Sequence, residues 1–134
     1  MKQDLTPATF VLDASAALRV VLSPADHSSV LTAIESASDV MAPQLFAAET
    51  ANTLCKYGRA GRLDNKEIRR RHAEALALVS LWIPDTRQFP EALSLASRLG
   101  HPVYDCLYLI AARRFDAQLL TADRRLEVLF ADIT

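Results

Sequence analysis

Residues 10–18, FVLDASAAL, decide the fold class of this 134-residue chain. A short apolar run of strand-forming residues ends at Leu12, Asp13 follows it, and small and apolar residues come next with helical spacing. We expect a strand over Thr9–Leu12 and a helix over residues 16–22. Asp13 then lies at the carboxyl end of a strand that leads into a helix, which is the repeating unit of a parallel sheet.

The same alternation continues along the chain. Strands are expected over residues 40–42, 81–83 and 118–121, with a possible final strand over 130–133. Helices are expected over residues 24–36, 44–59 (broken at Gly58 and Gly61), 64–81 (opened by a capping box of Asp64 and Glu67), 91–99, 103–115 and 123–129. The sequence therefore predicts one α/β domain over residues 1–134, with a central parallel sheet of about four to five short strands and helices on both faces. Ligands of such sheets bind beyond the carboxyl ends of the strands.

Composition excludes several classes of site. The chain has 51% apolar and 23% charged residues but only three glycines, too few for a glycine-rich phosphate loop. Its three histidines lack the spacing of a zinc site. Cys55 and Cys106 each lie in an apolar helical pattern, and we expect both to be buried free thiols. No apolar stretch is long enough to span a membrane, and the first residues lack a signal-peptide core, so the expected location is the cytoplasm.

Charge is distributed unevenly. The formal net charge is −1, yet residues 56–71 carry seven basic side chains against two acidic ones. This basic block could follow RNA phosphates or could be an ordinary solvated helix face. Arg69 and Arg70 are the candidate RNA contacts within it. The pairs Arg113-Arg114 and Arg124-Arg125 compete with them, because each pair lies close in sequence to one of the acidic residues discussed next.

Two aspartates lie where parallel strands should end at one sheet edge. Asp13 follows the first strand, and Asp123 follows the strand over residues 118–121. Either could simply cap the helix that comes next. Asp105 is more unusual, because it is the one charged residue in the apolar segment PVYDCLYLIAA, where an ionised carboxylate is costly unless it is paired or binds a cation.

Glu49 adds a fourth candidate carboxylate. It shares one helical stripe with Asn52 and Lys56, a pattern that a solvated face would also show. Hard cations such as Mg²⁺ bind to one or two carboxylates, waters and phosphate oxygens. A cation held by such a cluster can activate water for attack on a phosphodiester.

The motifs FVLDASAAL, PQLFAAETANTL, YDCLYLIAA and LLTADRRL, in this order, resemble the PIN-domain ribonucleases and, more narrowly, the VapC-type toxins of prokaryotic toxin–antitoxin pairs. The resemblance covers residues 10–129. It implies a PIN-like three-layer fold and an endoribonuclease dependent on Mg²⁺ or Mn²⁺. It further implies a homodimer that is inhibited by a small antitoxin protein.

The resemblance also assigns site residues. Asp13 and Asp105 match acids expected to bind the metal directly, and Glu49 and Asp123 would complete the site directly or through water. Ser15, Asn52 and Thr121 match the polar residues around the acids.

Two other functions are compatible with parts of the pattern. Aspartate-phosphorylating α/β proteins also place an Asp after the first strand, but phosphatases of this kind need a second acid where this chain has Ser15. Receiver domains need a late lysine, and the last lysine here is Lys66. The remaining alternative is a catalytically silent PIN-like module that binds RNA or protein.

Overall fold

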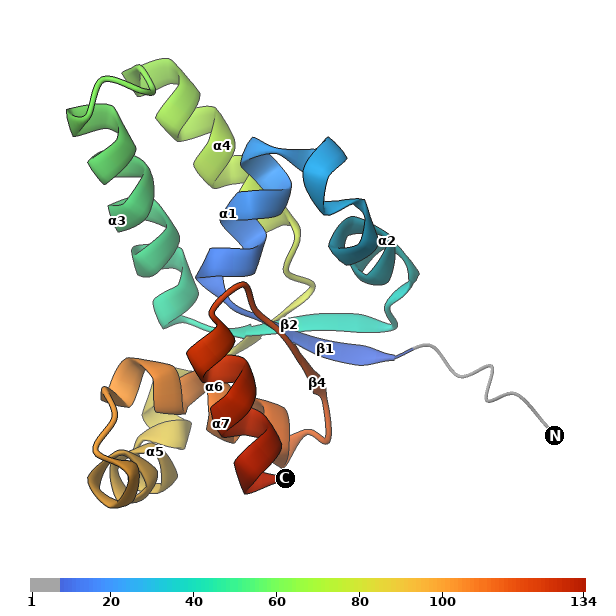
Figure 1. Cartoon of the computed structure of the whole chain (residues 1–134), viewed down its shortest axis with the longest axis vertical. Coiled ribbons are helices and arrows are strands. Elements are labelled where there is room, and N and C mark those ends of the chain that lie inside the picture. The colour runs from blue at the N-terminus through green and yellow to red at the C-terminus, as the bar shows by residue number, and fades with distance from the viewer. Residues whose placement is uncertain (1–7) are drawn as a thin grey trace, which may run out of the picture.

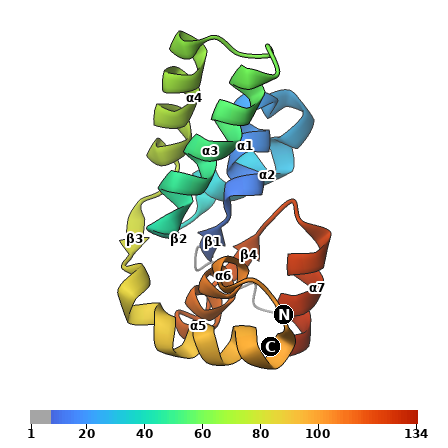
Figure 2. The same ribbon diagram turned by 90° about the vertical axis from the view of Figure 1, so that its left-hand side faces the viewer.

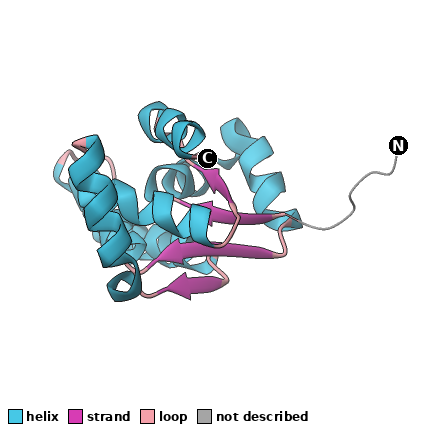
Figure 3. Cartoon of the chain, turned by 90° about the horizontal axis from the view of Figure 1, so that it is seen from below, coloured by secondary structure: helices cyan, strands magenta, loops and turns pink. Residues whose placement is uncertain are grey.

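The structure is a computed structural model that describes residues 8–134. Its centre is a sheet with the strand order β3-β2-β1-β4, and every pairing in it is parallel (Figure 1; Figure 3). The strands are β1 (Thr9–Leu12), β2 (Asp39–Pro43), β3 (Leu81–Ile83) and β4 (Gln118–Leu120). All are short and mostly apolar, as strands covered on both faces usually are. The predicted parallel α/β class is confirmed.

Helices cover both faces of the sheet, and Figure 2 shows the two helical layers edge on. On one side lie α1 (Ala14–Leu22), a 3₁₀ turn η1 (Pro24–His27), α2 (Ser28–Ser36), α3 (Leu45–Arg59) and α4 (Asn65–Ala77). On the other lie α5 (Asp85–Leu99), α6 (Val103–Arg114) and α7 (Arg124–Ile133). The helices α3 and α4 form a hairpin that extends away from the sheet (Figure 1). None of the described helices is both long and apolar enough to cross a membrane.

Helix α6 is the centre of the core on its side of the sheet. Its residues 106–112 are all buried, and the helix packs against β1 and β2. This explains why its sequence is apolar nearly all round, since a helix with neighbours on every side has no solvated face. Asp105, one residue before this run, is only partly buried in the first turn of the helix. Packing in the core therefore fixes the position of α6, while the first turn of the helix, with Asp105, stays partly accessible.

The predicted final strand is wrong, because residues 130–133 belong to α7. Leu126, Leu129, Phe130 and Ile133 pack together against the core, and their spacing of three and four residues is helical. These apolar residues therefore bury one face of a helix instead of forming a strand. The sheet accordingly has the lower of the two strand numbers that the sequence allowed.

Helix α5 begins at Asp85, six residues before the predicted start. Pro90 lies inside this helix on an exposed face. Gln88, Ala92 and Leu95 are buried on the opposite face at helical spacing. Their burial keeps the segment helical across the proline, which lacks the backbone N–H that a helix interior uses.

Helix α3 continues through Gly58 to Arg59, whereas a break at this glycine was expected. A Cβ at Gly58 would lie 2.6 Å from Cδ1 of Ile68 on α4, so the missing side chain lets the two helices approach closely. The chain turns at Gly61, whose φ of +76° favours glycine. The capping box of Asp64 and Glu67 is confirmed at the start of α4, which ends at Ala77 rather than at residue 81.

The two cysteines differ in environment. Both thiols are free, and Cys106 is buried as predicted. Cys55 is exposed, so that prediction is wrong. The buried stripe of α3 consists of Phe46, Thr50 and Leu54, and the next residue after Leu54 lies outside the stripe.

Candidate active site

A cavity of about 600 Å³ lies at the carboxyl ends of β1 and β4, and all four predicted acids line it. Asp13 follows β1 and Asp123 follows β4 by three residues. Glu49 comes from α3, which begins just after β2, and Asp105 comes from the first turn of α6. Four segments distant in sequence therefore bring their carboxylates to one hollow. The cavity is also lined by Ser15, Arg19, His27, Thr53, Tyr57 and Tyr108.

Asp13 is the most buried and most tightly held of the acids. Its side chain is 5% exposed, and its Oδ1 accepts hydrogen bonds from the Ser15 hydroxyl at 2.7 Å and the Ala16 amide at 3.0 Å. Its Oδ2 accepts from the Thr121 hydroxyl at 2.5 Å. Burial raises the pKa of Asp13 in spite of these bonds, and the nearby charge of Asp123 adds to the rise. The bond from Ala16 also confirms that Asp13 caps α1.

Ser15 and Thr121 join the two strand ends. The Ser15 Oγ accepts from the Ala122 amide at 3.0 Å, and the Thr121 Oγ1 accepts from the Asp123 amide at 2.9 Å. Asp123 in turn caps α7, since its Oδ1 accepts from the amides of Arg125 and Leu126 at 2.9 and 3.4 Å. Both aspartates at strand ends are therefore helix caps that also line the cavity.

Glu49 is positioned by Tyr108, which the sequence analysis did not identify. The Tyr108 hydroxyl donates to Glu49 Oε1 at 2.6 Å, and Tyr108 is 3% exposed. Burial raises the pKa of Glu49, the bond from Tyr108 opposes this, and the charges of Asp13, Asp105 and Asp85 add to the rise. Burial and the charge of Glu49 also raise the pKa of Tyr108, so the proton of this pair stays on the phenol.

Asp105 has basic neighbours. The Arg125 Nη2 donates to Asp105 Oδ2 at 3.2 Å, and His101 Nδ1 lies 3.8 Å from the same oxygen. Burial raises the pKa of Asp105, and Arg125 and His101 oppose the rise, whereas Asp123 adds to it. By contrast, no described basic side chain forms an ion pair with Asp13 or Glu49.

The residues available fit a hard divalent cation by their donor chemistry. Every candidate ligand is a carboxylate oxygen, and mutual repulsion contributes to the raised pKa of Asp13, Glu49 and Asp105. Among residues 8–134, no three acidic, histidine or cysteine side chains meet closely enough to form a complete ligand set by themselves. Mg²⁺ does not need such a set, because it keeps several waters and binds to one or two carboxylates.

The other predicted residues lie further out. Asn52 is exposed on α3 and does not line the cavity. Arg69 and Arg70 are exposed on α4, where Arg70 lies 3.9 Å from Glu74. Arg113 lines a separate hollow at the carboxyl end of α6, and Arg124 is exposed at the start of α7, next to Asp123.

A sequence signal existed for one of the missed residues. Tyr108 follows Asp105 by three positions on a helix, and therefore shares a face with it. Arg125 was a candidate RNA contact from the sequence, and its contact with Asp105 was not anticipated. Arg19, Thr53 and Tyr57 gave no such signal, because only the packing of α1 against α3 brings them to the same hollow.

Comparison with known proteins gives a consistent set of relatives. The family model of the PIN domain matches residues 10–130. Ribonuclease VapC3 of Pyrobaculum aerophilum is 30% identical over 118 residues, which make up 87% of this chain and 90% of that protein.

Solved structures show the same fold. PAE2754 from Pyrobaculum aerophilum has a TM-score of 0.71 at 24% identity, covering 93% of this chain and 88% of that one. VapC20 of Mycobacterium tuberculosis, described as a toxin that cleaves the sarcin-ricin loop, has a TM-score of 0.69 at 16% identity, covering 90% and 94%. VapBC2 of Rickettsia felis, solved with a DNA fragment from its promoter, has a TM-score of 0.59 at 14% identity, covering 89% and 91%.

Proposed function

This chain belongs to the PIN-domain family, and from that premise we propose that it is a divalent-metal-dependent endoribonuclease, the toxin of a VapBC-type toxin–antitoxin pair. The observation that carries the proposal is the convergence of Asp13, Glu49, Asp105 and Asp123 on one cavity at the carboxyl edge of the sheet. Four acids from four segments have no structural need to meet, because only Asp13 and Asp123 cap helices. A catalytic role accounts for their convergence.

Asp13 and Asp105 would hold Mg²⁺ or Mn²⁺ directly, and Glu49 and Asp123 would complete the site directly or through water. When bound, the cation supplies a Lewis acid that activates water and offsets the charge that develops on the phosphodiester. Asp13 is held for this task by three hydrogen bonds, and Glu49 by its bond from Tyr108. Such support fixes the direction in which each carboxylate faces the cavity.

Polar residues around the acids have separable tasks. Ser15 and Thr121 both donate hydrogen bonds to Asp13 and so orient its two oxygens. The same bonds lower the pKa of Asp13 and thus oppose the effect of burial. Asn52 is the third polar residue that the family resemblance places around the acids. Because Tyr108 already contacts Glu49 and Asn52 is exposed, contact with the substrate is the role that we propose for Asn52.

RNA is the proposed substrate, and the relatives named VapC support this choice. The exposed Arg69 and Arg70 on α4, with Arg113 and Arg124, are the proposed contacts to its phosphates. The further proposals are a small antitoxin partner, a homodimer and a single domain over residues 1–134, of which residues 1–7 lie outside the described part. The VapBC2 structure supports the antitoxin. An RNA substrate implies action in the cytoplasm.

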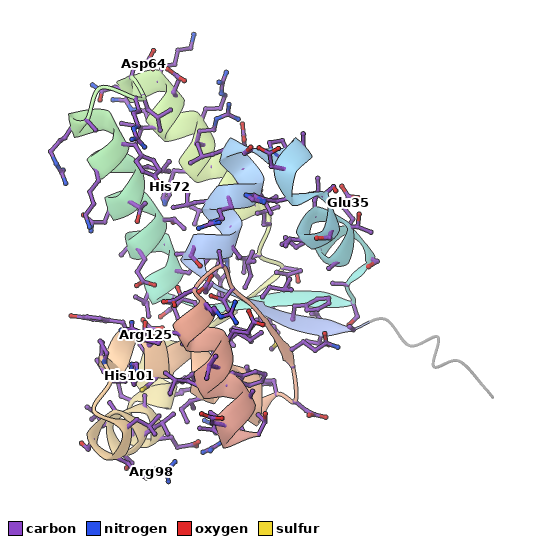
Figure 4. All side chains as sticks on the ribbon, in the orientation of Figure 1. Glu35, Asp64, His72, Arg98, His101 and Arg125 are labelled. Carbon is purple, nitrogen blue, oxygen red and sulfur yellow. The ribbon has the colours of Figure 1, made fainter. Side chains whose placement is uncertain are left out.

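A cleavage assay with the purified protein tests the proposal. Single-stranded RNA should be cut in the presence of Mg²⁺ or Mn²⁺ and left intact in EDTA, and Asp105→Asn should abolish cleavage while the protein stays folded. The exposed acid Glu35 on α2 offers a control, because Glu35→Gln removes one negative charge away from the cavity (Figure 4). Cleavage by Asp105→Asn at the parent's rate would refute the site. RNA binding without cleavage under any of these conditions would instead favour the catalytically silent module.

A further inference from the structure

Arg125 is the basic side chain in direct hydrogen-bonded contact with one of the proposed ligands. Its Nη2 lies 3.2 Å from Asp105 Oδ2, and its side chain is 61% exposed, against 22% for Asp105 (Figure 4). The backbone of Arg125 is fixed, because its amide is bound by the cap of α7 at Asp123. Only the side chain of Arg125 is therefore free to change partner.

The contact places Arg125 in competition with a cation. A guanidinium on Asp105 Oδ2 neutralises the charge that would attract a metal ion, and two cations on one carboxylate repel each other. Within the described part of the chain, no basic side chain forms an ion pair with Asp13, Glu49 or Asp123. Of the four acids, Asp105 is therefore the one at which a protein side chain opposes metal binding.

We infer that Arg125 exchanges Asp105 for a phosphate oxygen of the RNA when metal and substrate bind, and so acts as a substrate-binding residue. This inference rests on the proposed function. Arg125 has the chemistry for both partners, because its planar guanidinium forms paired hydrogen bonds to carboxylate and to phosphate alike. Its exposed side chain lies beside Asp105, which lines the cavity, and is therefore accessible to a strand of RNA.

If Arg125 exchanges partners in this way, its replacement should strengthen metal binding and weaken RNA binding. Arg125→Gln should tighten binding of Mn²⁺ alone, measured by calorimetry, by about two- to fivefold, which is the worth of an exposed ion pair. The same variant should raise the KM for a single-stranded RNA by about tenfold or more, the worth of a charged hydrogen bond to phosphate. If the role of Arg125 were purely structural, the substitution would instead weaken the binding of both Mn²⁺ and RNA. Arg125→Lys keeps the charge and should return Mn²⁺ affinity close to that of the parent.

Arg98→Gln is the matched control. Arg98 is exposed in the last turn of α5 and lines the separate hollow that also contains Glu91, so its loss removes the same charge without touching the cavity. Both Mn²⁺ affinity and KM should stay at the parent's values. Unchanged or weaker Mn²⁺ binding by Arg125→Gln, or an unchanged KM, would overturn the exchange while the parent still cleaves RNA. A parent that neither binds Mn²⁺ nor cleaves RNA would refute the proposed function, and the exchange with it.

Discussion

Replacing Asp13 with Asn should stabilise the protein in the absence of divalent cations. The substitution keeps the shape of the side chain and an acceptor for the Ala16 amide, but it removes a charge from a site that is 5% exposed and close to Asp123. We expect a gain on the order of 1 kcal/mol, which is the usual size of the effect when a single substitution relieves an unfavourable charge. For a domain of this size that gain raises the Tm by about 3–5 °C.

The gain should depend on pH in a direction set by the raised pKa of Asp13. Between the ordinary carboxyl pKa and this raised value, the folded parent binds more protons than the unfolded chain, so its stability falls as pH rises. The Asn variant lacks this loss. Its advantage in Tm should therefore grow from acidic to neutral pH and level off above the folded pKa.

Mg²⁺ should reverse the order of the two proteins. At a concentration one hundred times its Kd, a ligand that binds only the folded state contributes about 2.7 kcal/mol, and Asp13→Asn should gain much less than the parent. Thermal melts with and without Mg²⁺ measure both effects, with Glu35→Gln as the control for a lost surface charge. Asp13→Ala separates the cap from the charge, since loss of the cap costs about 1 kcal/mol. Equal Mg²⁺-induced shifts in the parent and in Asp13→Asn would refute a metal site at Asp13.

Three further substitutions test other parts of the site. Asp105→Asn should abolish RNA cleavage and lower Mg²⁺ affinity by at least tenfold with little change in Tm, as a gel assay and calorimetry would show. Tyr108→Phe removes the hydroxyl that donates to Glu49 at 2.6 Å, and should lower kcat more than it raises KM; an unchanged kcat would contradict a positioning role. Replacing Arg69 and Arg70 together with Gln should weaken RNA binding and flatten its dependence on salt, by a slope of about 0.7 for each lost phosphate contact, while Mg²⁺ affinity stays the same. A salt slope equal to the parent's would assign this pair to solvent or to a protein partner.

The sequence predicted the elements that position the acids, because each of these elements has a strong local signal. The strand before Asp13 and the apolar helix after Asp105 follow from hydrophobic pattern alone, and the strand order then brings their ends together. The start of α5 was missed because burial of Gln88 and Ala92 against the rest of the protein holds this segment in a helix across Pro90. Local patterns do not contain such long-range packing.

Contacts between side chains were less predictable than their shared location. That the four acids would line one hollow was expected from the sheet edge and from the family resemblance. That Tyr108 would hold Glu49 depends on the crossing of α6 and α3, and the pairing of Arg125 with Asp105 depends on the path of the chain after β4. These geometries are set by tertiary packing, and hydrophobic spacing says nothing about them.

Because the two cysteines differ in exposure, the folded chain should react with a thiol-specific label at one position. Cys55 on α3 is open to a maleimide dye, whereas Cys106, next to Asp105, is completely shielded. One label per chain should therefore attach beside the basic block, where its fluorescence can follow docking of RNA without any engineered cysteine. A second, slow labelling event requires α6 to separate from the core. The rate of labelling at Cys106, measured by mass spectrometry, therefore reports how often the helix that carries Asp105 opens.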